Sequence, residues 1–345
     1  MREEKKINPD LGHERLARRM QPKLSYQKGA EYSKWKEEIR DKFLELTGLN
    51  NIQENACAPN LQIEWEEDKG AYRLIRFTFE SEPDEIVPCY LCIPNTGKKK
   101  YPVAIVLQGH TTGFHLSIGE SKVDGDERFI PRSAHALQAV ERGFIALAIE
   151  QRGLGERKPS SPAHFPMEQC RYAVTTAIQL GRTVLGERMW DVSRAIDLLS
   201  CFPECDQEKI MIMGPSGGGT ASYYSACYDE RIKLSVPVCA FCNYLDSIIL
   251  RGHCTCNFIP NAYRYFDMQD LSCLIAPRRL LVVNGREDTI FPITGARKAF
   301  ETVQAVYDEM GASTHCRMVE TPKHHYFCED IVWDAVMEEI ERLGW

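Results

Sequence analysis

The sequence predicts an α/β protein built on a doubly wound, mostly parallel β-sheet. Three observations lead to this fold class. Five short, continuous apolar runs are typical of strands that are buried on both faces. Helical patterns separate these runs along the chain, as in parallel sheets with helical crossovers. The segment before them alternates between apolar and polar residues, which indicates an antiparallel meander.

The first 60 residues are expected to form a helical extension. They are rich in Lys, Arg and Glu, and Trp35, Ile39 and Phe43 recur at helical spacing. This spacing predicts one or two amphipathic helices. Their apolar faces need a cover, either on the main domain or on a second subunit of a homo-oligomer. The pattern leaves both arrangements open.

Residues 61–345 are expected to form the main domain. The meander is predicted at 61–65, 72–79 and 86–93. Buried strands are predicted at 103–107, 144–149, 210–213, 234–238 and 280–283, and a last strand at 315–319. Helices are predicted at 131–142, 188–199, 219–228, 296–310 and 331–343. Segment 151–185 is too long for a plain connection, so a cap or lid is expected there, with residues 241–265 as a second contributor.

Composition limits the class of partner. The 345 residues are 26% charged with a net charge of −7, which is typical of a soluble globular protein. The negative charge argues against nucleic acid or an anionic membrane as the main partner, so a small molecule is expected. Apolar runs are far shorter than the roughly 18 residues that span a bilayer. No secretory signal is visible at the N-terminus, and we expect a cytoplasmic protein.

The fourteen cysteines are expected to be reduced in that compartment. One group has the spacing of a metal site, with Cys239-x-x-Cys242 followed by Cys254-x-Cys256. Four thiolates can bind a tetrahedral zinc ion, but the second pair has one intervening residue in place of two. Buried or cavity-lining thiols are the favoured interpretation, so we predict no metal ligands. A zinc site formed by these four cysteines is the alternative.

The strongest functional signal is the run from Gly214 to Gly219, with the sequence GPSGGG. It follows a buried strand directly and precedes a helix. A G-x-S-x-G sequence on such a turn exposes the serine hydroxyl above the sheet, which predicts Ser216 as a nucleophile. The helix start places the Gly217 N–H beside it, ready for an oxyanion. A phosphate-binding loop is a poorer fit, because no Lys-Ser/Thr pair follows.

A serine nucleophile needs a base and an acid, which in this kind of sheet follow it in the order Ser, acid, His. Asp288 lies just after the strand at 280–283 and is the predicted acid, with Glu287 as its competitor. The base is expected in the loop after the last strand, where His324 and His325 are adjacent. Spacing leaves both open, and His324 is the alternative to His325.

A second oxyanion donor is expected from the loop after the first buried strand, which reads Gln108-Gly109-His110. The His110 backbone N–H would complete the oxyanion hole with Gly217, and the N–H of Thr111 is the alternative. The His110 side chain could instead contact the substrate.

With these residues the sequence resembles the α/β-hydrolase superfamily, and within it the branch of acetyl xylan esterases and dienelactone-hydrolase-like proteins. The resemblance rests on the Ser216 turn, Gln108-Gly-His, Glu150-Gln-Arg-Gly, the helix at 189–199 and Asn284-Gly-Arg-Glu-Asp288. It covers about residues 61–345. In serine hydrolases of this superfamily the base often lies in a Gly-Gly-His-x-Phe loop, which aligns with His325 and Phe327 and favours His325.

The resemblance implies the hydrolysis of a carboxylic ester through an acyl-serine intermediate, with no metal or organic cofactor. Ser216, Asp288 and His325 would form the triad, and Gly217 and His110 the oxyanion hole. Arg152 is a candidate for bracing the active-site loops through a buried ion pair, with a surface arginine as the alternative. A small acyl or acetyl ester is the expected substrate, an acetylated sugar among the candidates. A serine peptidase, a lactone hydrolase and a noncatalytic scaffold are the competing functions.

Overall fold

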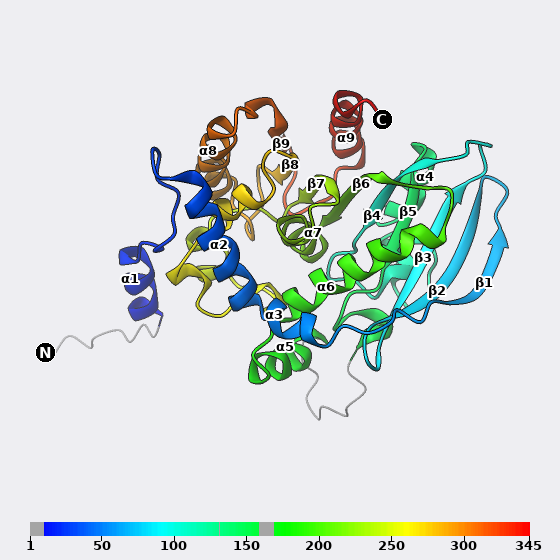
Figure 1. Cartoon of the computed structure of the whole chain (residues 1–345), viewed down its shortest axis with the longest axis horizontal. Helices are drawn as coiled ribbons and strands as arrows, with labels where there is room; N and C mark the ends of the chain where they lie inside the picture. The colour runs from blue at the N-terminus through cyan, green and yellow to red at the C-terminus, as the bar shows by residue number, and fades with distance from the viewer. Residues whose placement is uncertain (1–9, 131, 159–168) are drawn as a thin grey trace, which may run out of the picture.

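The chain folds around one sheet of nine strands. The computed structural model describes residues 10–130, 132–158 and 169–345. The strands are β1 (Gln62–Asp68), β2 (Tyr72–Glu82), β3 (Glu85–Pro94), β4 (Tyr101–Val106), β5 (Ile145–Ile149), β6 (Cys205–Pro215), β7 (Ile232–Val238), β8 (Arg279–Gly285) and β9 (Cys316–Thr321). Their order across the sheet is β1-β2-β3-β5-β4-β6-β7-β8-β9 (Figure 1). The predicted α/β class is therefore confirmed.

The antiparallel part of the sheet lies at one edge. Strands β1, β2 and β3 pair antiparallel, and β3 pairs antiparallel with β5. From β5 to β9 all neighbours are parallel. Every residue of the edge strand β1 is exposed, whereas every residue of β5 and β8 is buried. Burial on both faces explains why the parallel strands are continuous apolar runs in the sequence.

Helices cover both faces of the sheet. On one face, side chains of α4 (His135–Glu141) and α9 (Glu329–Leu343) share a core with Ala104 and Val106. On the other, α6 (Val184–Asp197), α7 (Gly217–Tyr228) and α8 (Ile293–Glu309) share a core with Val103 and Ile105. Successive residues of β4 thus enter different cores, as the alternation of side chains along a strand requires.

The functional edge of the sheet follows from the strand order. After β4 the chain forms β5 on one side of β4 and then returns to form β6 on the other side. Such a reversal leaves a crevice at the carboxyl ends of the strands, because the two crossovers diverge there. The loops after β4 and β6, which carry His110 and Ser216, meet at this point.

Three helices precede the sheet, where one or two were expected. They are α1 (Leu11–Arg19), α2 (Tyr32–Thr47) and α3 (Leu49–Glu54). Gly48, at a φ of 76°, ends α2 in a left-handed conformation and separates it from α3. Phe43 of α2 packs on Tyr224 and Phe266, with ring centroids 5.9 and 6.3 Å away. The apolar face of α2 is thus covered within the chain. The homo-oligomer expected through these helices stays a prediction.

Two insertions lie over the carboxyl ends of the strands. The first follows β5 and contains α5 (Gln169–Gln179), and the second lies between β7 and β8 and is built of short helical turns such as Leu245–Ile249 and Thr255–Asn257. The cap predicted at 151–185 includes residues 159–168, among them His164 and Phe165, which lie outside the described residues. None of the described helices is long and apolar enough to cross a membrane.

Some helix boundaries differ from those predicted. Helix α6 begins at Val184, four residues before the predicted start, because the Thr183 side chain accepts a hydrogen bond from the Gly186 N–H at 2.9 Å and caps the helix. Helix α4 begins at His135, later than the predicted start at residue 131. Helix α7 begins at Gly217, before the predicted start at residue 219, because Ser216 is its N-cap residue.

Candidate active site

Ser216 lies on the tight turn between β6 and α7. Its φ of 53° and ψ of −122° are outside the regions that residues with a Cβ atom prefer. Two hydrogen bonds fix this conformation. The Ser216 N–H donates to the Val238 carbonyl, and the Ser216 carbonyl accepts from the Thr220 N–H, each at 2.8 Å. The serine is therefore held at the carboxyl end of β6 at the cost of local backbone strain.

Glycines allow the elements around this turn to pack closely. A Cβ atom on Gly219 would lie 2.6 Å from the Gly214 carbonyl oxygen and 2.7 Å from Cβ of Ala240. A Cβ atom on Gly218 would lie 2.6 Å from the Gln108 carbonyl oxygen. Real side chains do not reach such distances, so the glycines let α7 start directly against the ends of β4 and β7.

Asp288 and His325 form a hydrogen-bonded pair. The distance from Asp288 Oδ2 to His325 Nδ1 is 2.8 Å. The other carboxylate oxygen, Oδ1, accepts hydrogen bonds from the N–H groups of Ile290 and Phe291 at 2.8 and 2.9 Å. The ring of Phe291 stacks on that of His325, with centroids 6.1 Å apart. The carboxylate thus orients the imidazole, leaving its Nε2 atom for other partners.

The residues next to Asp288 and His325 in the sequence, Glu287 and His324, are not part of this hydrogen-bonded pair. Glu287 and His324 are exposed, and the described contact of the His324 ring is with Tyr326, at 6.2 Å between centroids. Asp288 is buried beneath the loop. The structure thus places Asp288 and His325, and not the competing pair, in contact with each other.

Ser216 and His325 both line one cavity of about 350 Å³. The loop after β4 contributes His110, and the insertion between β7 and β8 contributes His253. Four aromatic rings complete much of the apolar wall, those of Phe129, Phe291, Tyr326 and Phe327. The volume is within the range of small-molecule sites.

The charge of this cavity is positive. Among the described residues, no Asp or Glu lines it, and Arg132 is its one lining Arg or Lys. The Arg132 guanidinium lies over the ring of Tyr326, 4.6 Å from the centroid. Burial lowers the pKa of His253, and it lowers that of His135 to about 4, so both imidazoles are neutral at pH 7.

The loop after β4 lies against the Ser216 turn. A Cβ atom on Gly109 would be 3.1 Å from the Pro215 carbonyl oxygen and 3.5 Å from Cβ of Ser216. The His110 ring is equally close to Gly217, where a Cβ atom would lie 2.5 Å from Cε1. Within the described part of the chain, the backbone N–H groups of His110 and Gly217 donate to no protein acceptor. Both amides are therefore available to a bound oxygen atom.

The sequence matches the Abhydrolase family over residues 11–232, which is more than half of the chain. The chain belongs to the Abhydrolase family. The match includes the N-terminal helices, which the resemblance drawn from motifs had left outside.

Known proteins resemble this Abhydrolase member in sequence and in structure. It is 25% identical over 255 residues to YtaP of Bacillus subtilis (strain 168), a protein named as a hydrolase, with 73% of this chain and 82% of YtaP covered. A crystal structure from Bacteroides fragilis NCTC 9343, named as an acetyl xylan esterase, superposes with a TM-score of 0.78 at 16% identity, covering 98% and 96% of the two chains.

Two further structures share the architecture. A glucuronoyl esterase from Solibacter usitatus has a TM-score of 0.65 at 16% identity, covering 92% of this chain and 96% of that one. An acetyl xylan esterase from Paenibacillus sp. R4 has a TM-score of 0.63 at 18% identity, covering 87% and 94%. The fold of this Abhydrolase member is therefore the α/β-hydrolase fold.

Buried Glu150 holds the loop after β4 in this Abhydrolase member. The Gln108 side chain donates to Glu150 Oε1, and the N–H groups of Phe114 and Glu156 donate to Oε2 at 3.3 and 3.1 Å. Gln151 adds a bond of 2.6 Å from Nε2 to the Gln108 carbonyl. Burial raises the pKa of Glu150 to about 7, against the hydrogen bonds of the two N–H groups.

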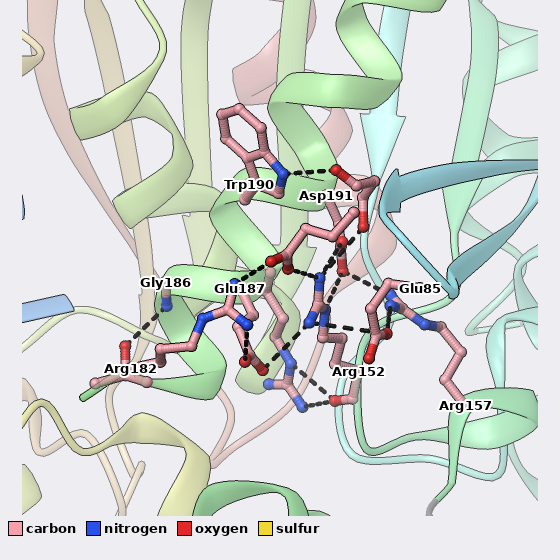
Figure 2. A network of polar contacts seen from close by, with 12 residues as sticks. Glu85, Arg152, Arg157, Arg182, Gly186, Glu187, Trp190 and Asp191 are labelled. Carbon is pink, nitrogen blue, oxygen red and sulfur yellow. Dashed lines mark hydrogen bonds and ion pairs between the residues drawn. The ribbon is translucent and has the colours of Figure 1, made fainter. Parts of the chain in front are cut away.

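Arg152 lies in a buried network of ion pairs (Figure 2). Its guanidinium contacts Glu82 at 2.8 Å and Asp191 at 3.1 Å, and all three side chains are less than 10% exposed. Arg157 contacts Asp191 at 2.6 Å from the other side. Arg182 pairs with Glu82, so the network connects β2, α6 and the loop after β5.

The four cysteines singled out by spacing do not gather. The Cys239 thiol donates to the Tyr326 carbonyl at 3.5 Å beside the Asp288–His325 pair, and that of Cys242 to the Pro292 carbonyl at 3.6 Å. Cys254 and Cys256 lie instead with Cys170 and His110. Burial raises the pKa of Cys239 to about 12, so it packs beside the pair as a neutral thiol.

Sequence reasoning missed several residues of this Abhydrolase member's site. His253 and Arg132 line the cavity but lie in segments without a recognisable motif. Glu150 and Gln151 belong to a segment that supported the resemblance, but no role was predicted for them, although polar residues directly after a buried strand are a usable signal. That pattern indicates side chains turned toward the neighbouring loops.

Proposed function

We propose that this protein is a serine hydrolase that cleaves a small carboxylic ester through an acyl-serine intermediate. One observation carries the proposal. The Asp288–His325 hydrogen bond orients an imidazole that lines the same cavity as Ser216, which is held on a strained turn. A nucleophile, a base and an acid that orients the base are the components of a triad.

The first half-reaction forms the acyl-enzyme. The Ser216 Oγ atom attacks the ester carbonyl while His325 Nε2 takes the hydroxyl proton. The Asp288 carboxylate accepts the Nδ1–H bond and stabilises the imidazolium. The backbone N–H groups of Gly217 and His110 donate to the developing oxyanion. When the tetrahedral intermediate collapses, the imidazolium returns the proton to the leaving alkoxide, and an alcohol departs.

The second half-reaction restores the enzyme. A water molecule attacks the acyl carbon as His325 removes one of its protons, and the same two amides stabilise the second oxyanion. Collapse of this intermediate breaks the bond to Ser216 Oγ, which regains its proton from the imidazolium. The products are one carboxylic acid and one alcohol. The chain's own residues carry every proton transfer of this mechanism.

The cavity supports a small acyl group and a polar alcohol. Its volume of about 350 Å³ suits a short acyl chain such as acetyl rather than a long one. Arg132 can hydrogen-bond hydroxyl or carboxylate groups of the alcohol part, so an acetylated sugar fits this wall. Related folds carry the names acetyl xylan esterase and glucuronoyl esterase, which agrees with this class.

The test is the turnover of p-nitrophenyl acetate by the full chain and by Ser216→Ala. We expect the substitution to lower kcat/KM by about 10⁴-fold or more, without a change in circular dichroism. Ser200→Ala, at an exposed serine, is the matched control and should retain activity. Full activity of Ser216→Ala would refute the nucleophile.

A substrate panel then tests the class. It compares acetyl, butyryl and longer acyl esters, acetylated xylose, a lactone and a peptide anilide. We expect acetyl esters to give the highest kcat/KM and the anilide the lowest. Faster cleavage of the anilide than of any ester would favour the peptidase alternative. Preference for the lactone would favour the lactone hydrolase.

A further inference from the structure

Three cysteines and a histidine gather at the wall of the candidate active site, from segments far apart in the sequence. The donor atoms of His110, Cys170, Cys254 and Cys256 all lie within 4.8 Å of one another. The Sγ atoms of Cys254 and Cys256 are 3.5 Å apart, and His110 Nε2 is 3.1 Å from the Cys256 Sγ. We propose that these four residues bind one zinc ion in a closed, tetrahedral, structural site.

The distances suit this ion. With Zn–S bonds of about 2.3 Å and Zn–N bonds of about 2.0 Å, the edges of a tetrahedron are about 3.8 Å between two sulfur atoms and about 3.5 Å between sulfur and nitrogen. The Cys254–Cys256 separation of 3.5 Å and the His110–Cys256 separation of 3.1 Å are within about 0.4 Å of these values, and the other four separations are at most 4.8 Å. Three thiolates and one imidazole are an established ligand set for structural zinc.

Arg188 supplies an independent observation. Its buried guanidinium lies 3.3 Å from the Cys256 Sγ and 3.7 Å from the Cys170 Sγ. Its other described hydrogen bonds go to the Arg152 carbonyl, and none of the described ion pairs gives it a carboxylate. A buried guanidinium without an anion is costly, so a negatively charged centre is expected beside it, and a metal bound by thiolates would supply one.

The charges then balance. A Zn²⁺ ion with three thiolates and a neutral imidazole carries a net charge of −1, and the Arg188 guanidinium neutralises it. Hydrogen bonds from cations or N–H groups to the ligand atoms are the usual outer partners of metal sites. Since protein residues fill all four positions, the ion has no open position for a substrate.

The site would join three segments that are far apart in the sequence. His110 belongs to the loop after β4, Cys170 to the start of α5, and the other two cysteines to the insertion between β7 and β8. Cys170 and Cys256 belong to a small satellite core with Leu154, Val174 and Val184, separate from the two main cores. A metal ion bound by these side chains would hold this small core together. Because His110 and Cys254 line the cavity, the ion would also fix its wall.

The spacing of the cysteines could not reveal this set. The sequence pattern grouped Cys254 and Cys256 with Cys239 and Cys242, whereas the fold brings in Cys170 and His110 from a distance. The inference goes beyond the proposed function, because it concerns four residues whose side chains take no part in the acyl transfer.

The first experiment measures metal content of the full chain, purified without a histidine tag or added chelator. We expect about one zinc per chain by elemental analysis. Thiol titration of the denatured, metal-free chain should find all fourteen cysteines reduced. A chain that binds no zinc even after incubation with the metal would overturn the proposal. So would a disulfide between any two of Cys170, Cys254 and Cys256.

Matched cysteine variants locate the metal. Cys256→Ser and Cys170→Ser should lose stoichiometric zinc, whereas Cys242→Ser, at a buried cysteine outside the set, should retain it. Retention of zinc by Cys256→Ser, or its loss in Cys242→Ser alone, would contradict the assignment. These readouts need no catalytic activity, so they stand apart from the esterase tests.

Cobalt substitution keeps the proposal testable if the serine variants do not fold. The wild-type chain, stripped with a chelator and loaded with Co²⁺, should show thiolate-to-cobalt charge-transfer bands and the intense visible bands of tetrahedral cobalt. Removal of the metal should lower the melting temperature by several degrees, and zinc should restore it. A spectrum of octahedral cobalt without sulfur bands would overturn the site.

Discussion

Asp288 Oδ2 lies 2.8 Å from His325 Nδ1, although 37 positions separate the two residues in the chain. The carboxylate is held by the N–H groups of Ile290 and Phe291, so it cannot turn away from the imidazole. A carboxylate fixed in this way selects the imidazole tautomer that carries its hydrogen on Nδ1. The tautomer leaves Nε2 free to accept a proton.

Asp288→Asn tests the role of this bond. The amide can no longer stabilise an imidazolium and favours the wrong tautomer, so kcat for p-nitrophenyl acetate should fall by about 10⁴-fold. Steady-state kinetics at several pH values would measure it. Glu287→Gln removes the exposed neighbouring carboxylate and should change kcat less than threefold. Equal losses in the two variants would contradict the assignment.

The two adjacent histidines provide a second matched pair. His325→Ala removes the imidazole that lines the cavity and should lower kcat/KM by about 10⁴-fold or more. His324→Ala removes an exposed ring and should retain kcat/KM within a few fold. Both are measured with the same ester. A larger loss in His324→Ala would transfer the role of the base to that residue.

Glu150 is expected to make the free energy of unfolding depend on pH. Its pKa is about 7 in the folded chain against an ordinary value of 4.5. The folded state therefore binds more protons between these pH values than the unfolded state does. The stability that Glu150 contributes is greatest below pH 4.5 and is lost as the pH rises through 7. The loss should be about 3 kcal/mol. In Glu150→Gln this contribution is absent.

Urea unfolding at pH 5 and pH 8 measures the effect. The difference in unfolding free energy between the two pH values should be smaller in Glu150→Gln than in the wild type. Glu208→Gln, which removes an exposed carboxylate, is the control and should behave like the wild type. An unchanged pH dependence in Glu150→Gln would show that another group is responsible.

Substitution of Arg152 is expected to lower the stability of the fold. Arg152→Met leaves the buried carboxylates of Glu82 and Asp191 with one cation fewer, which should cost about 3 kcal/mol of unfolding free energy. Arg286→Met breaks an exposed pair with Glu320 and should cost less than about 1 kcal/mol. Chemical denaturation compares the two. Similar losses would mean that burial does not govern the Arg152 pairs.

The sequence predicted the sheet, and it singled out Asp288 and His325, which the structure brings into contact, because both predictions depend on local signals. Strands buried on both faces are apolar runs, and the residues after them at one edge are Ser216, Asp288 and His325. Residues that only tertiary packing brings into contact have no such local signal in the sequence. The cavity residues Arg132 and His253, and the meeting of Cys170 with Cys256, depend on how the insertions fold over the sheet.

Some predicted helix boundaries were wrong for a related reason. The apolar spacing of α6 begins at residue 188, but a threonine cap and the tight contact of Gly186 with the carbonyl of Thr47 extend the helix to Val184. The cap is a single hydrogen bond, and the contact involves a segment about 140 residues away. Neither is visible in hydrophobic periodicity.

The central claim is that Ser216 is the activated nucleophile, and covalent labelling tests it most directly. The full chain is treated with a fluorophosphonate and analysed by intact and peptide mass spectrometry. We predict one adduct per chain, on the peptide that contains Ser216, with slow labelling in His325→Ala and none in Ser216→Ala. An adduct on another residue, or labelling of Ser216→Ala at the wild-type rate, would contradict the account.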